Sequence, residues 1–267
     1  VCPEKVSVVT DKLKKDFSAA GIDESDAEWI VSIVSGIKRS ELGGDKKLKS
    51  SEIDKINKLA AQRLTGKPLC YVLGNCDFKV DERVLIPRPE TEELVSEVLK
   101  VASRDKTVLD LCTGSGAIAL VISKKSGAKV VATDISEGAL EVAKENFKLF
   151  DADIKTELID LYGDIDDKFD IIVSNPPYIK TSDMDGLDDV VKNYEPHLAL
   201  DGGADGLDFY RRICAGAKAR LNDGGMIFLE VGAGQANDVK KMLDEEFNVE
   251  IIKDISGVDR IIRAELK

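Results

Sequence analysis

Hydrophobic residues recur every three to four positions along residues 3–65, which is the period of an amphipathic helix. Gly21 interrupts the first repeat, and Asp23 stands where the N-cap residue of a second helix is expected. A third helix is predicted to begin at Ser51 and to end at Leu64. The pattern predicts a small helical bundle without residues that indicate chemistry. Its role is either to stabilise the chain or to dock a partner, and the sequence leaves both open.

Residues 69–86 change to the two-residue period of β-strands. Short apolar stretches flank Gly74-Asn75 and Asp81-Glu82, dipeptides that are typical of turns. We therefore predict a β-hairpin over residues 67–89 that links two domains. Pro87-Arg-Pro-Glu-Thr91 ends this hairpin, and Thr91 is a candidate cap for the next helix.

From residue 107 onward, apolar runs rich in β-branched residues alternate with helical repeats. Such alternation predicts an α/β fold, with a parallel sheet covered by helices on both faces. The last two runs have no helix between them, so we expect an antiparallel hairpin at one edge. The predicted strands are residues 107–111, 129–133, 154–159, 169–174, 225–231, 248–253 and 260–266. The predicted helices lie near residues 116–125, 136–149, 208–221 and 235–246.

The composition fits an intracellular protein. The chain has 267 residues, 43% of them hydrophobic, and no run approaches the ~18–20 apolar residues that span a bilayer. Its first residues become charged at once, unlike those of a signal peptide. The five cysteines form no Cys-x-x-Cys pair, and there is a single histidine. We therefore expect reduced thiols, a cytoplasmic location and no metal site.

The charge is unevenly distributed along the chain, whose net charge is −12. Residues 1–80 carry 14 Lys and Arg against 12 Asp and Glu, whereas residues 81–267 carry 24 against 38. Nucleic-acid binding depends on cationic side chains that displace counterions from phosphates. The acidic second part therefore argues mildly against duplex DNA as a partner.

A glycine-rich turn follows the first strand of the α/β region. In Asp110-Leu-Cys-Thr-Gly-Ser-Gly116, both glycines allow a ligand to approach the backbone, and the next helix starts with free N–H groups. Asp134 ends the following strand, where a carboxylate can bind both hydroxyls of a ribose. The pattern indicates an adenosine-type cofactor, although a nicotinamide enzyme has similar features and the glycines can also serve packing alone.

A second motif, Asn175-Pro-Pro-Tyr178, follows the apolar run that ends at Ser174. Two prolines end a strand, because each lacks a backbone donor and fixes φ. Asn175 then offers an amide oxygen and two N–H donors at the sheet edge, freed carbonyls can also accept, and Tyr178 adds a flat ring. This set suits a planar –NH₂ group, such as a carboxamide or the amine of a base. The alternative is a loop that only ends a strand.

Two features favour S-adenosylmethionine as the cofactor. Asp110 lies just before the turn, and an acidic pocket suits a sulfonium and an ammonium but repels a diphosphate. In a doubly wound sheet the fourth strand, which carries Asn175, lies beside the first, so a methyl acceptor would lie beside the donor. Asp160 and Leu161, at the end of the third strand, are placed to bond the adenine amine and to pack on its ring.

Taken together, these motifs make the chain resemble the HemK/PrmC family of protein-glutamine methyltransferases. The resemblance covers nearly the whole chain. It rests on Val84-Leu-Ile-Pro-Arg-Pro-Glu-Thr-Glu92, the turn that ends at Gly116, Val173-Ser-Asn-Pro-Pro-Tyr-Ile179, the segment Glu195–Tyr210, and Glu230-Val-Gly-Ala-Gly-Gln235. Two positions depart from the family pattern: Cys112 replaces a glycine, and Leu161 replaces a residue that is often aromatic.

The resemblance implies a seven-stranded, Rossmann-like class I methyltransferase fold with an antiparallel C-terminal hairpin. We expect a helical substrate-docking domain over residues 1–66, the linking β-hairpin over 67–89, and an S-adenosylmethionine-dependent methyltransferase domain over 90–267. The implied reaction methylates the side-chain amide nitrogen of the glutamine in the Gly-Gly-Gln motif of class-1 peptide-chain release factors, and leaves S-adenosylhomocysteine. We expect a monomer in a bacterial cytoplasm that binds neither nucleic acid nor membrane.

The resemblance also implies roles for individual residues. Asn175 and the Pro176 carbonyl would accept the two N–H bonds of the substrate amide, which orients the nitrogen for attack without a strong base. Tyr178 would pack on that amide, and these three are the expected catalytic residues. Substrate binding is expected from Asn175, Pro176, Pro177 and Tyr178. Cofactor binding is expected from Asp110, Thr113, Gly114, Ser115, Gly116, Asp134, Ile135, Asp160, Leu161 and Asn175.

Several other features and functions remain open at this stage. Arg88 and Glu90 either border the site or hold the two domains together, and His197 is better explained as a structural loop residue than as an acid or base. The acidic residues 183–189 fit a solvated loop over the substrate edge. An adenine-amine methyltransferase shares both central motifs but should carry a basic face. A non-catalytic partner-binding protein is disfavoured by the intact tetrapeptide, and a dehydrogenase by the lack of a catalytic His/Lys or Tyr/Lys set.

Overall fold

The computed structural model describes residues 4–65, 67, 69, 72 and 78–267. Contacts between Cα atoms divide the chain into two compact units, residues 1–77 and 78–267. The first unit is built from helices, and the second contains all the strands of the main sheet. Each unit is described separately below.

The first unit packs its helices around a core of its own. Helices α1 (Val6–Ala19), α2 (Glu24–Ser35) and α3 (Ser50–Leu64) bury the apolar positions that recur at helical spacing, with Phe17 and Ile30 fully buried. The Asp23 carboxylate accepts a hydrogen bond from the Ser25 N–H, which confirms the predicted cap of the second helix. A short 3₁₀ turn, η1 (Arg39–Glu41), lies between α2 and α3.

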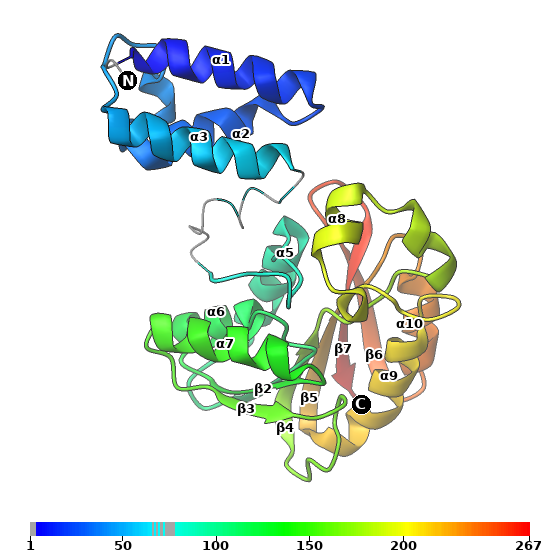
Figure 1. Cartoon of the computed structure of the whole chain (residues 1–267). Helices are drawn as coiled ribbons and strands as arrows, with labels where there is room; N and C mark the ends of the chain where they lie inside the picture. Colours follow the sequence, from blue (N-terminus) through cyan, green and yellow to red (C-terminus); the bar gives the residue numbers. More distant parts are fainter. Residues whose placement is uncertain (1–3, 66, 68, 70–71, 73–77) are drawn as a thin grey trace. The chain divides into compact units, whose positions relative to one another are not determined.

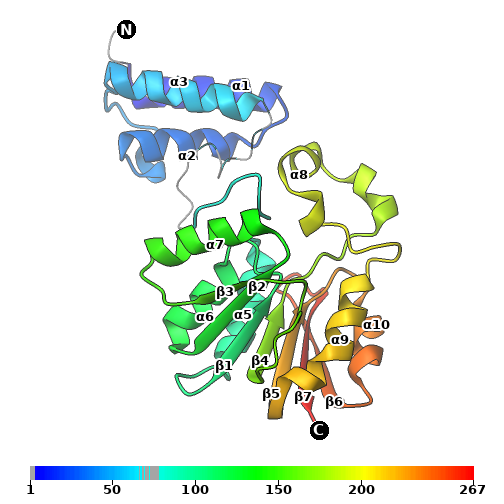
Figure 2. The same cartoon turned by 60° about the horizontal axis from the view of Figure 1, so that its bottom comes forward.

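The second unit is organised by a seven-stranded sheet in the order β3-β2-β1-β4-β5-β7-β6 (Figure 2). The first five strands along the chain pair in parallel, and β7 pairs antiparallel with both β5 and β6. The predicted α/β fold and its antiparallel C-terminal hairpin are therefore confirmed. The strands are β1 (Thr107–Leu111), β2 (Lys129–Asp134), β3 (Lys155–Leu158), β4 (Phe169–Ser174), β5 (Leu221–Glu230), β6 (Phe247–Lys253) and β7 (Asp259–Leu266).

Helices cover both faces of this sheet (Figures 1 and 2). On one face, Val108, Ile171 and Phe228 pack with apolar residues of α5, α6 and α7. On the other face, Leu109 and Ile172 pack with residues of α9 and α10. Successive strand residues thus enter opposite cores, as the pleat of a strand requires. The helices are α5 (Pro89–Leu99), α6 (Ala117–Ser126), α7 (Glu137–Leu149), α9 (Asp208–Arg220) and α10 (Ala236–Leu243).

The connection between β4 and α9 is built from short helical turns. It contains η2 (Thr181–Gly186), α8 (Asp189–Tyr194) and η3 (His197–Ala199). The His197 side chain is exposed on the last of these turns. The backbone of Ile179 pairs with this connection in an isolated bridge to Asp201, which ties the segment after Asn175 to the start of the α9 region.

The predicted linking hairpin requires a correction. Residues 78–88 contain no strand, so the strands predicted at Phe78–Val80 and Val84–Ile86 are wrong; most of the remaining hairpin falls outside the described residues. The reason is visible at Lys79, whose backbone N–H donates to the Asn146 side-chain oxygen (2.5 Å) while its carbonyl accepts from the Asn146 amide (2.9 Å). A side chain of α7 thus satisfies the backbone groups that a strand partner would have bonded.

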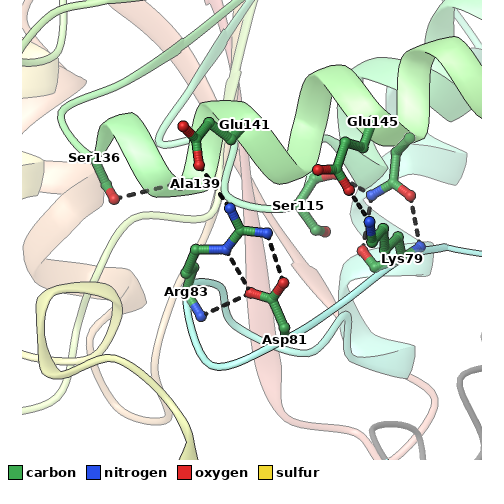
Figure 3. A network of polar contacts seen from close by, with 9 residues as sticks. Lys79, Asp81, Arg83, Ser115, Ser136, Ala139, Glu141 and Glu145 are labelled. Atoms are coloured by element: carbon green, nitrogen blue, oxygen red, sulfur yellow. Dashed lines mark hydrogen bonds and ion pairs between the residues drawn. The ribbon is translucent and has the colours of Figure 1, made fainter.

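Ion pairs fix the same segment to α7 (Figure 3). Arg83 donates to both carboxylate oxygens of Asp81 (2.9 and 2.7 Å) and to Glu141 (2.7 Å), and Lys79 pairs with Glu145. Arg83 and Val84 are consequently held at the edge of the cavity described below. The sequence showed these charges but not their partners, which lie about 60 residues further along the chain.

The expected cap at Thr91 is also wrong. Helix α5 begins at Pro89 with Arg88 as its N-cap residue, so Thr91 lies inside the first turn. Its hydroxyl is therefore available for a contact elsewhere, which proves important for the site.

Within the described part of the chain, no helix has both the length and the apolar character needed to cross a membrane.

Candidate active site

The turn after β1 carries the first half of the site. Gly114 and Gly116 both adopt positive φ (55° and 79°), and Gly116 is the N-cap residue of α6. A Cβ on Gly116 would lie 2.6 Å from the Phe147 ring, so glycine is required for the close packing of α6 on α7. A Cβ on Gly114 would meet nothing within 4 Å, because this residue borders open space. The turn therefore exposes its backbone to a cavity.

Cys112, in the same turn, has φ of 57°. This left-handed conformation is strained for a residue with a Cβ. The backbone at this departure from the family pattern therefore adopts a conformation that glycine favours, although the residue is a cysteine. The thiol side chain lines the cavity, and burial raises its pKa.

Asp110 supports the turn from below. Its side chain is fully buried, and its Oδ2 accepts hydrogen bonds from the Thr113 hydroxyl (2.6 Å) and the Ala119 N–H (3.2 Å). Its Oδ1 is buried without a partner among the described residues, and burial raises the pKa of this carboxyl to about 7. Asp110 does not line the cavity, so the geometry gives it a clear role in shaping the turn.

Asp134 ends β2 and faces the turn directly. Its Oδ2 accepts a hydrogen bond from the Gly114 N–H and its Oδ1 from the Ser136 N–H, both at 2.9 Å. Burial raises the pKa of this carboxyl. The carboxylate lines the cavity next to Ile135, whose side chain is 52% exposed. An acidic group and an apolar surface thus lie side by side, as ribose and adenine binding require.

Two further expected residues line the cavity where β3 ends. Leu161 is buried with φ of 53°, and Asp160 forms an ion pair with Arg212 (2.6 Å). Phe209, at the start of α9, lines the same part of the cavity. This aromatic ring was not predicted; it packs under the guanidinium of Arg212, the partner of Asp160, and adds a flat apolar surface to the cavity.

The second half of the site begins where β4 ends. Ser174 is paired with Leu111 in the parallel register and donates its hydroxyl to the Leu111 carbonyl (2.7 Å), so Asn175 emerges beside the glycine-rich turn. The Asn175 Nδ2 donates to the Thr91 hydroxyl oxygen (3.1 Å). That hydroxyl in turn donates to the Glu230 carboxylate (2.7 Å).

The members of the Asn-Pro-Pro-Tyr motif have different surroundings. Asn175 and Pro177 line the cavity, whereas Pro176 is buried and Tyr178 is half-buried outside its lining. The Tyr178 ring packs against Gly232, and its carbonyl accepts a hydrogen bond from the Gln235 side chain (2.9 Å). The motif is therefore anchored to the start of α10 as well as to the sheet.

A partly buried ion pair holds the loop that begins at Glu195. The Arg88 guanidinium donates to both oxygens of Glu195 (2.6 and 2.8 Å), and the Glu195 side chain is only 1% exposed. Residues 196, 198 and 199, just after Glu195, line the cavity. Since both partners belong to residues 78–267, the structure gives Arg88 a role within this unit. Burial raises the pKa of Glu195, and Arg88 opposes that shift.

The two halves enclose one cavity of about 950 Å³, counting the space open to solvent at its mouth. It is lined by residues of the glycine-rich turn, by Asp134 and Asp160, by apolar side chains, and by Asn175. Acidic and apolar groups beside an exposed backbone fit a cationic adenosine derivative such as S-adenosylmethionine. Among the described residues, no group of three or more His, Cys, Asp or Glu side chains is placed to hold a metal ion.

Comparison with known proteins identifies the lineage of this site. Residues 90–204 match the family model of the methyltransferase small domain, and residues 10–74 match that of the PrmC N-terminal domain. The release factor glutamine methyltransferase of Thermodesulfovibrio yellowstonii is 39% identical, over 94% of this chain and 96% of its own. The enzyme of the same name from Geobacter sulfurreducens is 40% identical, over 95% and 94%.

The chain belongs to the release factor glutamine methyltransferase family. It is accordingly an S-adenosylmethionine-dependent methyltransferase. Among solved structures, a methyltransferase from Pyrococcus furiosus superposes with a TM-score of 0.56 at 20% identity, and covers 77% of this chain and 96% of its own. This likeness shows the fold alone. The fold, enzyme class and cofactor predicted from the motifs are therefore confirmed.

Sequence reasoning missed the residues that support Asn175. Thr91 was interpreted as a helix cap, and Glu230 was noted only as part of a family segment. Thr91 stands in Pro-Arg-Pro-Glu-Thr-Glu and Glu230 in Glu-Val-Gly-Ala-Gly-Gln, two of the segments that carry the family resemblance. Those two acidic motifs were the signal that could have pointed to a shared contact.

Proposed function

We propose that this family member methylates the side-chain amide nitrogen of the glutamine in the Gly-Gly-Gln motif of class-1 peptide-chain release factors. The observation that carries the proposal is the position of Asn175, which leaves β4 next to the glycine-rich turn of β1 and lines the same cavity. A planar amide bonded to Asn175 then lies next to a cofactor bound at the turn. The names of the relatives support a release factor as the substrate.

The cofactor half of the cavity is proposed to hold S-adenosylmethionine, which supplies an electrophilic methyl group on a sulfonium. Asp134 would bind the ribose hydroxyls, and Ile135 and Leu161 would enclose the adenine, with Asp160 at its amine. The turn residues from Thr113 to Ser115, which line the cavity, would border the rest of the molecule, and Gly116 would hold the turn in place. The sulfonium and ammonium charges favour a pocket with this acidic lining. Asp110 does not line the cavity and would contribute only by holding the turn.

The acceptor half is proposed to orient the substrate amide. An amide nitrogen is a weak nucleophile, because its lone pair is delocalised into the carbonyl. Two N–H bonds, accepted by Asn175 Oδ1 and by the Pro176 carbonyl, would hold the nitrogen in line with the methyl group. No described backbone N–H donates to the Pro176 carbonyl, which supports this role, although Pro176 is buried and is not among the residues that line the cavity. Methyl transfer would exchange the methyl–sulfur bond of the sulfonium for the new C–N bond, leaving S-adenosylhomocysteine, and the nitrogen would give up one proton. Positioning rather than a strong base would account for the rate.

The side chains of Pro177 and Tyr178 complete the proposed substrate surface. Pro177 lines the cavity beside Asn175. Tyr178, which is half-buried directly after Pro177, would pack its ring on the substrate amide. The loop that the Arg88–Glu195 pair holds would form the opposite wall.

We further propose that residues 1–66 dock the release factor, that residues 67–89 link the domains, and that residues 90–267 bind the cofactor. The first part has a nearly neutral charge and no catalytic side chains, which suits a docking role. The protein would act as a monomer in the cytoplasm, where release factors meet the ribosome, without binding nucleic acid itself. Removing residues 1–66 should raise the KM for the release factor and leave cofactor affinity unchanged.

The proposal is tested by a transfer assay with labelled S-adenosylmethionine. Three acceptors are offered: a release factor, the same factor with its Gly-Gly-Gln glutamine changed to alanine, and DNA. Label on the unmodified release factor alone supports the proposed reaction. Label on DNA would move the assignment to adenine methylation, and label on the glutamine-free factor would show that a different residue is modified.

A further inference from the structure

Two buried side chains hold one end of the Asn175 amide. Thr91, on α5, and Glu230, at the end of β5, are 8% and 1% exposed. The Asn175 Nδ2 donates to the Thr91 hydroxyl at 3.1 Å, and that hydroxyl donates to the Glu230 carboxylate at 2.7 Å. Strands β4 and β5 are paired, and Ser174 lies opposite Leu229. Asn175 comes directly after Ser174, and Glu230 directly after Leu229, so both residues stand at the same end of the sheet.

The order of donors in this chain of bonds follows from Glu230. An ionised carboxylate can only accept hydrogen bonds, so the single proton of the Thr91 hydroxyl is directed to Glu230. The hydroxyl oxygen then has only lone pairs to offer to Asn175, which must present Nδ2. The opposite end of the amide, Oδ1, is thereby turned away from Thr91. No hydrogen bond from another described residue reaches it, and Asn175 lines the cavity.

We propose that Glu230 is a positioning residue that, through Thr91, fixes the Asn175 amide with its oxygen toward the substrate. This inference rests on the proposed function, in which Oδ1 accepts an N–H bond of the substrate amide. The two ends of a carboxamide have nearly the same shape, so packing alone cannot choose between them. A hydrogen bond to a group that can only accept does choose between the two orientations, because only the NH₂ end of the amide can donate to it.

A reversed Asn175 would disable the site. It would direct its own N–H groups at the N–H groups of the substrate amide, and two donors in contact leave both unsatisfied. The substrate nitrogen would lose the acceptor that holds it in line. Because a release factor contacts a larger surface than one amide, this change should affect the rate of transfer much more than binding.

Opposing influences act on the pKa of Glu230. Burial raises the pKa of this carboxyl, while the hydrogen bonds from Thr91 and Asn175 and the charge of Arg260 on β7 lower it. Glu90, on α5, acts in the direction of burial. A neutral group at position 230 could donate to Thr91, whose hydroxyl would then donate to Asn175 Oδ1 and reverse the amide.

The test is the full-length variant Glu230→Gln, which keeps the shape but adds a donor. We expect kcat to fall about tenfold, because one of the two glutamine arrangements reverses Asn175. The KM for the release factor and the dissociation constant for S-adenosylmethionine should stay within twofold. The melting temperature should be unchanged or higher, since the variant removes a buried charge whose pKa is raised in the folded state. Glu250, an exposed residue of β6, provides the matched control: Glu250→Gln should behave as the wild type.

Thr91 provides the second pair of variants. Thr91→Val removes the hydroxyl at constant shape and should lower kcat about threefold to fivefold, since Glu230 can still attract Nδ2. Thr91→Ser keeps the hydroxyl and should retain more of the rate than Thr91→Val. The side-chain amide protons of Asn175, assigned in NMR spectra by their loss in Asn175→Ala, should exchange with water faster in Glu230→Gln than in the wild type.

The outcomes separate the two proposals. Glu230→Gln with a kcat within twofold of the wild type overturns the positioning role, and so does a parallel fall of kcat and melting temperature, which indicates only structural damage. An equal loss of cofactor affinity also overturns it. A wild-type kcat in Asn175→Ala overturns instead the acceptor role in the proposed function. A low kcat in both Asn175→Ala and Glu230→Gln, with stability retained in the latter, supports both.

Discussion

The two halves of the cavity hold their key polar residues by different means. On the cofactor side, the Asp134 carboxylate accepts from backbone N–H groups at Gly114 and Ser136, close to the strand ends from which they emerge. On the acceptor side, Asn175 depends on the side chains of Thr91 and Glu230, which lie 84 and 55 residues away in the sequence. Both halves are acidic, yet one is built by the backbone and the other by side chains.

This difference has consequences for substitution. Backbone donors persist whatever side chains the turn carries, provided that the turn keeps its φ angles. A chain of side-chain bonds fails when any one member changes. The cofactor half should therefore tolerate the Cys112 departure, while the acceptor half should be sensitive at each of its three positions.

The largest expected effect is that of Asn175→Ala. Removing the oxygen that accepts the substrate N–H should lower kcat by about 10²–10³, the range found when a preorganised polar contact to a reacting group is lost. The dissociation constant for S-adenosylmethionine, measured by calorimetry, should stay within a few-fold. Asn237→Ala, on the exposed face of α10, is the control. A variant that loses cofactor affinity to the same extent would show that the two halves are not separable.

The reverse behaviour is expected of Asp134→Ala. The loss of the proposed charged hydrogen bonds to the ribose should weaken cofactor binding by about 10- to 100-fold. At saturating cofactor, the variant should keep most of the wild-type kcat, because Asn175, Thr91 and Glu230 are unchanged. Titration calorimetry and cofactor-saturation kinetics check the two statements, with exposed Asp153→Ala as the control. Unchanged cofactor affinity would remove Asp134 from the binding site.

The Arg88–Glu195 pair allows a test of the loop after Glu195, which lines the same cavity as Asn175. Arg88→Met leaves the buried Glu195 carboxylate without its cation, and should cost about 1–2 kcal/mol of unfolding free energy. Solvent screening keeps the effect moderate, because the Arg88 side chain is 34% exposed. The KM for the release factor should rise as the loop loosens. Arg211→Met, which breaks an exposed pair with Asp205, should change neither quantity by denaturant titration or kinetics.

The buried Asp110 carboxyl should make the free energy of unfolding depend on pH. Burial raises its folded pKa to about 7, above the ordinary value of 3.8, so the folded protein binds this proton more tightly than the unfolded chain. Its contribution to stability is therefore complete below pH 4 and is lost as the pH rises to 7. The difference in unfolding free energy between Asp110→Asn and the wild type should shift in favour of the variant across this range. A difference that is constant with pH would contradict the assignment.

The smallest expected effects lie in the glycine-rich turn itself. Cys112→Gly relieves a left-handed conformation and should raise the unfolding free energy by about 0.5–1 kcal/mol. Gly114→Ala imposes the same strain without a steric contact and should lower it by a similar amount. Thermal unfolding of the two variants gives the comparison. Equal shifts in one direction would mean that φ does not govern this turn.

Much of the cofactor half could be predicted from the sequence. Apolar runs fixed the strands to within a few residues, except that β5 begins at Leu221 rather than at 225. Asp134 was found because its position depends on two strands and the turn between them. The prediction failed at residues 78–88, where Asn146 of α7 replaces a strand partner, and at Thr91, where a contact with Glu230 replaces a cap.

By itself, the sequence determined the alternation of strands and helices, the glycine-rich turn and the position of Asn175 at the end of a strand. These features depend on hydrophobic period, on the φ angles open to glycine and on the missing N–H of proline, all of which are local properties. Only the tertiary structure decided which carboxylate bonds to Thr91, which way the Asn175 amide turns, and that Arg88 binds Glu195. Those contacts join α5, β4, β5 and the loop before α9, and a side chain's partner is set by the packing of the sheet.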